Sequence, residues 1–205
     1  ALAIEEVFKK AGFPDNVFRL LMIGSSQVSK VIEHPLVKAV TLTGSTPAGK
    51  AVAAKAGQML KKTVLELGGS DPYIVLEDAD LEETVNACVF SRLLNGGQSC
   101  IAAKRFIVVE KVQKRFIEGF VETMKTYKLG DPLDETVKIG PQARHDLRDD
   151  LHRQVKESIA MGAECLLGGE IPDGKGAFYP PTVLTNVTKG MPAYDEELFG
   201  PVAAI

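Results

Sequence analysis

Cys100 is the residue of this sequence whose type and setting best suit covalent chemistry. It closes the run Asn95-Gly-Gly-Gln-Ser-Cys100, which follows a segment with helical spacing. Reactive groups lie on loops, and a nucleophilic thiol has to be exposed. We interpret Cys88, on the apolar face of that helical segment, and Cys165, in a strand-like run, as small buried hydrophobes. The pattern leaves a thiol hydrolase open, although Cys-Ile-Ala-Ala lacks the aromatic residue that follows a papain-type nucleophile.

Glu66 is the candidate general base. It ends a strand-like run and is followed by Leu67-Gly68-Gly69. An acid at the carboxyl end of a strand lies where sites form in α/β proteins, and partial burial would raise its pKa towards the range of a general base. The plainer interpretation is a solvated carboxylate at a strand end.

The run Gly44-Ser-Thr-Pro-Ala-Gly49-Lys50-Ala51 lies between a strand-like and a helical segment. Its glycines let backbone amides approach a ligand, and a helix N-terminus favours an anion, but an ordinary tight turn fits equally well. The run nearly matches a P-loop, with Ala51 where the Mg²⁺-binding hydroxyl belongs. It shares only the first and last glycines of the Rossmann fingerprint, and Glu66, 22 residues after Gly44, stands about where a ribose-binding acid belongs. These residues predict a binding site for a nucleotide or a dinucleotide, and they do not distinguish the two ligands.

A fourth motif is Glu196-Glu197-Leu198-Phe199-Gly200-Pro201. Taken alone it indicates an acidic turn before a strand, with Phe199 packing against its neighbours. No metal site is expected, because the three histidines (34, 145 and 152) lack the spacing of metal ligands.

The elements that position these motifs alternate between strands and helices. Apolar rather than alternating strand segments, separated by helices, predict an α/β fold with parallel sheets covered on both faces. Asp80 is expected to cap a helix, with Glu83 completing a capping box. The expected strands are 17–23, 37–42, 63–67, 73–77, 106–109, 164–167 and 182–184, and the expected helices cover about 1–11, 25–34, 50–57, 81–93, 112–124 and 147–159.

Composition limits the function classes. The chain has 205 residues, 45% of them hydrophobic, which excludes global disorder, and its formal net charge is −3. That charge argues against nucleic acid or an anionic membrane as partner, and no uncharged apolar run approaches the roughly 18 residues of a membrane helix. Three cysteines are too few for a disulfide framework, which favours a reducing, cytoplasmic compartment. We expect a segment of a larger protein, because the chain opens inside a helical pattern without Met and closes on a strand-like run.

Taken in order, four motifs resemble those of the aldehyde dehydrogenase superfamily. They are TGS-x-x-x-G (43–49), ELGG (66–69), GQxC (97–100) and ExFGP (197–201). Cys100 follows Glu66 by 34 residues and precedes Glu197 by 97, which fits the family's usual spacing. The similarity covers essentially the whole chain and outweighs both the P-loop and the thiol hydrolase. Within the superfamily, GQSCIAAKRFIV and ELFGPVAAI look most like bacterial succinate-semialdehyde dehydrogenases.

The resemblance implies oxidation of an aldehyde, succinate semialdehyde above others, to the carboxylic acid. Cys100 would add to the carbonyl, and its backbone N–H would be one donor to the resulting oxyanion. Glu66 would activate the water that hydrolyses the thioester. Leu94 stands where some succinate-semialdehyde enzymes carry an arginine, six residues before the nucleophile, and Arg92 is expected to point elsewhere.

NAD or NADP is the implied cofactor. The implied cofactor-binding residues are Gly44, Ser45 and Gly49 around the pyrophosphate, Leu67 by its backbone at the nicotinamide, and Glu197 and Phe199 at the nicotinamide-side ribose.

The implied domains meet near Gly68-Gly69. Residues 1–66 would be the C-terminal part of the NAD(P)-binding domain, and residues 67–205 a catalytic domain incomplete at its C-terminus. We expect the segment to be inactive alone, and the full-length parent to be a homo-oligomer. A P-loop-like nucleotide hydrolase and a non-catalytic protein of the same fold are the alternatives.

Overall fold

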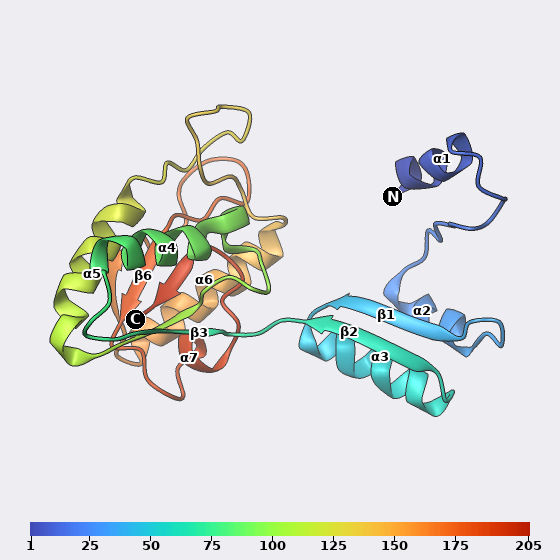
Figure 1. Cartoon of the computed structure of the whole chain (residues 1–205), viewed down its shortest axis with the longest axis horizontal. Helices are drawn as coiled ribbons and strands as arrows, with labels where there is room; N and C mark the ends of the chain where they lie inside the picture. Colours follow the sequence, from blue (N-terminus) through green and yellow to red (C-terminus); the bar gives the residue numbers. More distant parts are fainter. The chain divides into compact units, whose positions relative to one another are not determined.

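The computed structural model describes residues 1–205, and the chain divides into two compact units, Ala1–Leu67 and Gly68–Ile205. Each unit has its own sheet (Figure 1). None of the helices is both long and apolar enough to cross a lipid bilayer.

The first unit contains a parallel two-stranded sheet. Its elements are α1 (Leu2–Lys10), α2 (Ser25–Glu33), β1 (Ala39–Gly44), α3 (Thr46–Gln58) and β2 (Lys62–Leu67). Helix α3 connects the two strands and packs on both of them, and α2 packs on α3. The sequence predicts a sheet with helices on both faces, but in this unit helices cover only one face of the two-stranded sheet. Val64, on the other face, is 61% exposed. Figure 1 shows α3 running along the β1–β2 pair.

The predicted strand over 17–23 is wrong. This segment is irregular and largely exposed, because no neighbouring strand pairs with its backbone groups. It is held instead by α1: the Glu5 carboxylate accepts hydrogen bonds from the Arg19 side chain at 3.0 Å and from the Leu20 amide at 3.3 Å. The ring of Phe8 packs against those of Phe13 and Phe18.

The second unit is built on a five-stranded sheet in the order β3-β4-β7-β6-β5, parallel except for the β5–β6 pair. Its strands are β3 (Pro72–Val75), β4 (Arg105–Val108), β5 (Glu164–Leu167), β6 (Thr182–Thr185) and β7 (Val202–Ala204). Its helices are α4 (Leu81–Leu93), α5 (Glu110–Lys125), α6 (His145–Ala160) and α7 (Pro192–Asp195), with a 3₁₀ turn, η1 (Leu94–Gly97), after α4.

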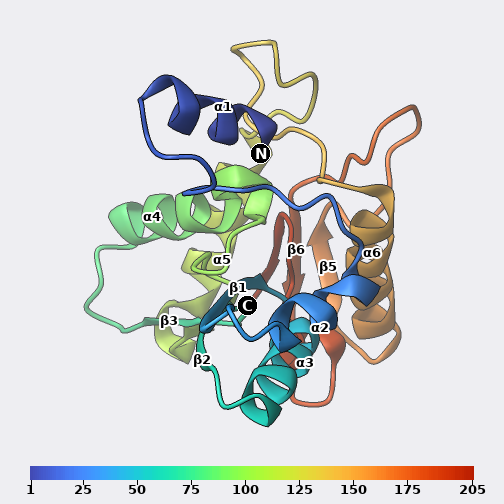
Figure 2. The ribbon, with the colours of Figure 1, turned by 90° about the vertical axis from the view of Figure 1, so that its right-hand side faces the viewer.

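Helices cover both faces of this larger sheet, as the apolar strands predict. Successive side chains of a strand point to opposite faces. Val183 and Ala203 accordingly belong to the core beneath α4 and α5, whereas Leu184 and Val202 belong to the core beneath α6. Figure 2 shows α4 and α5 on one side of β6 and α6 on the other.

Local signals at α4 hold in part. The Asp80 carboxylate caps the helix, accepting hydrogen bonds from the amides of Glu82 and Glu83, both at 3.1 Å. The predicted capping box is incomplete, because the Glu83 side chain makes no return bond to the Asp80 amide.

Candidate active site

Cys100 lies in an exposed loop that directly follows α4 and η1, as the sequence predicts. Three successive residues of this loop adopt left-handed backbone conformations, Asn95, Gly96 and Gly97, with φ of 54°, 62° and 74°. Only glycine, and to a lesser degree asparagine, enters this region at low cost. The Asn95 amide group donates to the Gln98 carbonyl at 3.0 Å, and the Gln98 side chain donates back at 3.3 Å. The loop therefore has a fixed shape.

Gly97 packs directly against the Gly200 backbone, so motifs far apart in sequence meet here. A Cβ at Gly97 would overlap the Gly200 carbonyl group and lie 2.8 Å from the guanidinium of Arg92. At Gly200 it would overlap Leu151 and lie 3.1 Å from the amide oxygen of Gln142. The glycines of GQxC and ExFGP are thus needed for close approach as well as for backbone freedom.

Arg92 is completely buried beneath the loop. Its Nη2 donates a 2.7 Å hydrogen bond to the Gly97 carbonyl, while Nε and Nη1 have no hydrogen-bond partner. Burial lowers the pKa of this guanidinium to about 10, and the charge of Glu197 opposes the shift. Arg92 therefore supports the loop, and Leu94, at the position six residues before Cys100, is exposed.

Lys104 is a second buried cation, and it holds the peptides on both sides of Cys100. Its Nζ donates to the Ser99 carbonyl at 3.2 Å and to the Cys100 carbonyl at 2.9 Å. The same Nζ forms an ion pair with Glu197 Oε1 at 3.2 Å, in which the lysine side chain is 0% exposed and the glutamate 25%. The Glu197 carboxylate also occupies the space that a Cβ at Gly68 would need. Residues of three predicted motifs therefore converge around Lys104.

Sequence patterns gave a usable signal for one of these two cations. Arg92 continues the apolar face of α4 that includes Val85 and Cys88, and a charge on such a face indicates a buried, bonded side chain. Lys104 has no comparable signal, since it follows Ala102 and Ala103 at the entrance to β4.

The predicted pyrophosphate residues lie at the N-terminus of α3. Ser45 caps this helix, and its Oγ accepts a 3.4 Å hydrogen bond from the Ala48 amide. Pro47 has no N–H to offer. The amide of Thr46, the first residue of the helix, donates no hydrogen bond to the backbone and is therefore free to bind a ligand. Gly49 is buried, and a Cβ there would lie 2.6 and 2.7 Å from the methyl groups of Leu67. That contact is the helix–strand packing that the last glycine of a dinucleotide fingerprint provides.

Glu66 lies on β2 beside Thr43 of β1, one residue before the strand ends. Its side chain is exposed. The partial burial expected from the sequence is therefore not found, because β2 lies in an open two-stranded sheet rather than in a covered one.

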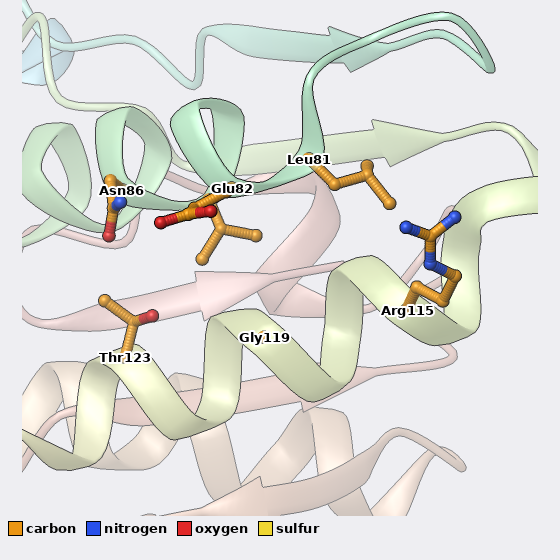
Figure 3. Close-up of a pocket in the computed structure, with 7 residues that line it drawn as sticks. Leu81, Glu82, Asn86, Arg115, Gly119 and Thr123 are labelled. Carbon is orange, nitrogen blue, oxygen red and sulfur yellow. The ribbon is translucent and has the colours of Figure 1, made fainter.

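The remaining predicted residue, Phe199, is 39% exposed. Figure 3 shows a separate pocket between α4 and α5, whose polar lining includes Glu82, Asn86, Arg115 and Thr123. No residue of the four motifs lines it. The two other thiols differ from that of Cys100: Cys88 is buried, and burial raises its pKa to about 11, while Cys165 is half-buried and its pKa is also raised by burial.

Known proteins similar to this chain include several succinate-semialdehyde dehydrogenases. Succinate semialdehyde dehydrogenase (NAD(P)+) Sad of Escherichia coli (strain K12) is 55% identical over all 205 residues, which are 44% of its own length. Succinate-semialdehyde dehydrogenase (NADP+) of Mycobacterium avium is 51% identical over the same residues, 43% of its length. The structure of succinic semialdehyde dehydrogenase from Streptococcus pyogenes in complex with NADP+ aligns with a TM-score of 0.96 at 42% identity, covering the whole chain and 45% of that structure.

The chain spans less than half the length of these relatives. The model of the aldehyde dehydrogenase family matches residues 1–205. This match agrees with the four motifs, and it decides against the P-loop hydrolase and the papain-type thiol hydrolase. The chain belongs to the aldehyde dehydrogenase family.

Proposed function

We propose that the protein oxidises succinate semialdehyde to succinate with NAD+ or NADP+, using Cys100 as the nucleophile. The relatives named above are succinate-semialdehyde dehydrogenases, and their names include NADP+ or NAD(P)+. The observation that carries the proposal is the setting of Cys100: an exposed thiol in a rigid loop, whose own amide donates no hydrogen bond to the protein. A nucleophile and an unused donor are what addition to a carbonyl needs.

In the first step the Cys100 thiolate adds to the aldehyde carbon. The π-electron pair moves to the carbonyl oxygen, and the free Cys100 N–H accommodates the oxyanion. Bound NAD(P)+ supplies the acceptor for the hydride whose loss turns this adduct into a thioester.

Glu66 is our candidate for the base of the second step. It would take a proton from the water that attacks the thioester, and the Cys100 thiolate would then leave with succinate formed. Its support is its place at the carboxyl end of β2, beside flexible glycines and exposed to solvent. An exposed carboxylate can exchange the proton it takes with bulk water.

The residues present fit a dinucleotide. Ser45 and the free Thr46 amide at the start of α3 suit a pyrophosphate, and Gly49 lets that helix end approach β2. Leu67 would contact the nicotinamide by its backbone. Glu197, a quarter exposed, has carboxylate oxygens suited to ribose hydroxyls, and the exposed ring of Phe199 offers a packing surface.

We assign residues 1–66 to the cofactor-binding domain and residues 67–205 to the catalytic domain. The division into compact units after Leu67 supports this assignment. We also propose a cytoplasmic homo-oligomer, a localisation supported by three free cysteines. Light scattering of the purified full-length protein tests the oligomer.

The decisive experiment measures formation of reduced nicotinamide by the full-length protein. Succinate semialdehyde and an uncharged aldehyde of similar length are each supplied with NAD+ and with NADP+. We expect preference for the charged aldehyde and loss of turnover in Cys100→Ala, whereas Cys165→Ala, a matched control outside the loop, keeps it. Turnover by Cys100→Ala would contradict the proposal, and equal use of both aldehydes would contradict the substrate assignment.

Glu66→Gln provides an independent test of the second step. We expect the thioester on Cys100 to form and then persist, which mass spectrometry of the acid-quenched protein detects. A variant that neither accumulates the thioester nor slows turnover would remove Glu66 from the mechanism.

A further inference from the structure

The Lys104 side chain is completely buried, so its ammonium must be held by polar groups inside the protein. An ammonium has three N–H donors, and burying it unpaired is costly. Two of its N–H groups donate hydrogen bonds, to the Ser99 carbonyl and to the Cys100 carbonyl, and the charge is balanced by an ion pair with Glu197 Oε1 at 3.2 Å, which accepts no hydrogen bond. The lysine therefore has one well-defined position, and the two peptide groups flanking Cys100 are fixed to it.

The bond to the Ser99 carbonyl also fixes the direction of the Cys100 amide. A peptide group is planar and trans, so its C=O and N–H point in opposite directions. Lys104 and the Ala102 amide both donate to the Ser99 oxygen, at 3.2 Å each. The N–H of Cys100, on the same peptide group, consequently points away from Lys104, and it donates no hydrogen bond of its own.

A charged donor on the oxygen of a peptide group also polarises that group. Hydrogen bonds in a chain strengthen one another, and a cation on the carbonyl makes the N–H a better donor. An ion pair with Glu197 keeps the ammonium against the loop.

We propose that Lys104 is a positioning residue for the oxyanion donor: it orients and polarises the Ser99–Cys100 peptide group so that the Cys100 N–H stabilises charge developing on a bound carbonyl. This inference rests on the proposed role of Cys100 as nucleophile. It extends that role to a completely buried residue that acts through the peptide groups beside Cys100.

Two reagents distinguish oxyanion stabilisation from mere exposure of the thiol. With p-nitrophenyl acetate, the Cys100 thiolate forms a C–S bond, the carbonyl pair moves to oxygen, and the returning pair expels p-nitrophenolate. Iodoacetamide is attacked at its CH₂ carbon, iodide leaves, and no oxyanion forms. Both reactions proceed without the cofactor, so they are informative even if the protein lacks dehydrogenase activity.

The test compares wild type with Lys104→Met in the full-length protein. Acylation is followed by the burst of p-nitrophenolate, with Cys100→Ala as background, and alkylation by mass spectrometry of the Cys100 peptide. Both rates are taken at alkaline pH where they no longer rise, so ionisation of the thiol does not enter. We expect acylation to fall by about 10–100-fold while alkylation stays within about twofold.

Lys111→Met is the matched control, because Lys111 forms an exposed ion pair with Glu77 and should change neither rate. If Lys104→Met does not fold, Glu197→Gln provides the test. This variant removes the charge that pairs with Lys104 but leaves both hydrogen bonds from Lys104 to the loop carbonyls. The acylation rate should then fall by about 2–10-fold, and the alkylation rate should not change. Equal losses in both reactions, or no loss in either, overturn the proposal. With the acylation effect present but aldehyde turnover absent, the proposed function fails and this inference stands.

Discussion

Replacing Gly97 by alanine should destabilise the protein more than the same change at its neighbour Gly96. Both glycines have left-handed backbone conformations, with φ of 74° at Gly97 and 62° at Gly96. They differ in what a methyl group would meet. At Gly97 it overlaps the Gly200 backbone and lies 2.8 Å from Arg92, while at Gly96 the nearest atom is 3.5 Å away, at the end of the Gln98 side chain.

The expected magnitudes follow from these contacts. A left-handed alanine costs about 1–2 kcal/mol, which is the whole effect expected at Gly96. At Gly97 the overlap with the Gly200 backbone adds about 1–3 kcal/mol. Displacing the loop would also strain the 2.7 Å bond from Arg92, and hydrogen bonds to charged groups contribute about 1.5–3 kcal/mol. Gly97→Ala should therefore cost about 3–8 kcal/mol, a large part of the 5–15 kcal/mol typical of a folded protein.

Urea unfolding of the full-length protein and both variants measures these costs. We expect a clearly lower midpoint for Gly97→Ala and a small decrease for Gly96→Ala, with similar slopes. Similar midpoints for the two variants would refute the reasoning, since they would show that the approach of the loop to Gly200 carries no energetic weight.

Gly49 and Gly57 lie in the same helix, but only Gly49 faces Leu67 of β2. A methyl at Gly49 would press on that side chain, so Gly49→Ala should cost about 1–3 kcal/mol in thermal or urea unfolding. Gly57→Ala meets nothing within 4 Å and should be neutral or stabilising by up to about 1 kcal/mol; the opposite order would contradict the packing. A hydrogen bond from Gln154 holds the pKa of Glu196 below its ordinary 4.5, so this carboxylate stabilises the fold above that pH and ceases to do so as the pH falls through the lower folded value. The stability gap between wild type and Glu196→Gln should accordingly narrow below pH 4.5, and a gap independent of pH would exclude the effect.

Local signals were sufficient where neighbouring residues decide the structure. The α4 face with Val85 and Cys88, its Asp80 cap and the loop that exposes Cys100 could all be predicted from spacing and residue type. The segment 17–23 could not, because an apolar run becomes a strand only when another strand pairs with it. The prediction that Glu66 is partly buried was wrong for the same reason. Burial of this side chain depends on how many strands and helices surround β2, and no local sequence pattern specifies that number.

Residue types in the sequence indicate the nucleophile of this site more readily than the two buried cations, Arg92 and Lys104, that hold its loop in place. Three left-handed residues turn the chain within the loop, and the Gly97, Ser99 and Cys100 carbonyls accept hydrogen bonds from the buried side chains of Arg92 and Lys104. Buried carbonyls need donors, and the loop itself supplies too few. A neutral side chain with one donor could bond only one of these carbonyls, whereas Lys104 bonds two. Arg92 lies in the last turn of α4, where the helix dipole favours a cation. The motif places the nucleophile, and side chains outside the motif hold its geometry. The apolar face of α4 indicates Arg92 in advance, but Lys104 can be recognised only once the folded loop shows which carbonyls it bonds.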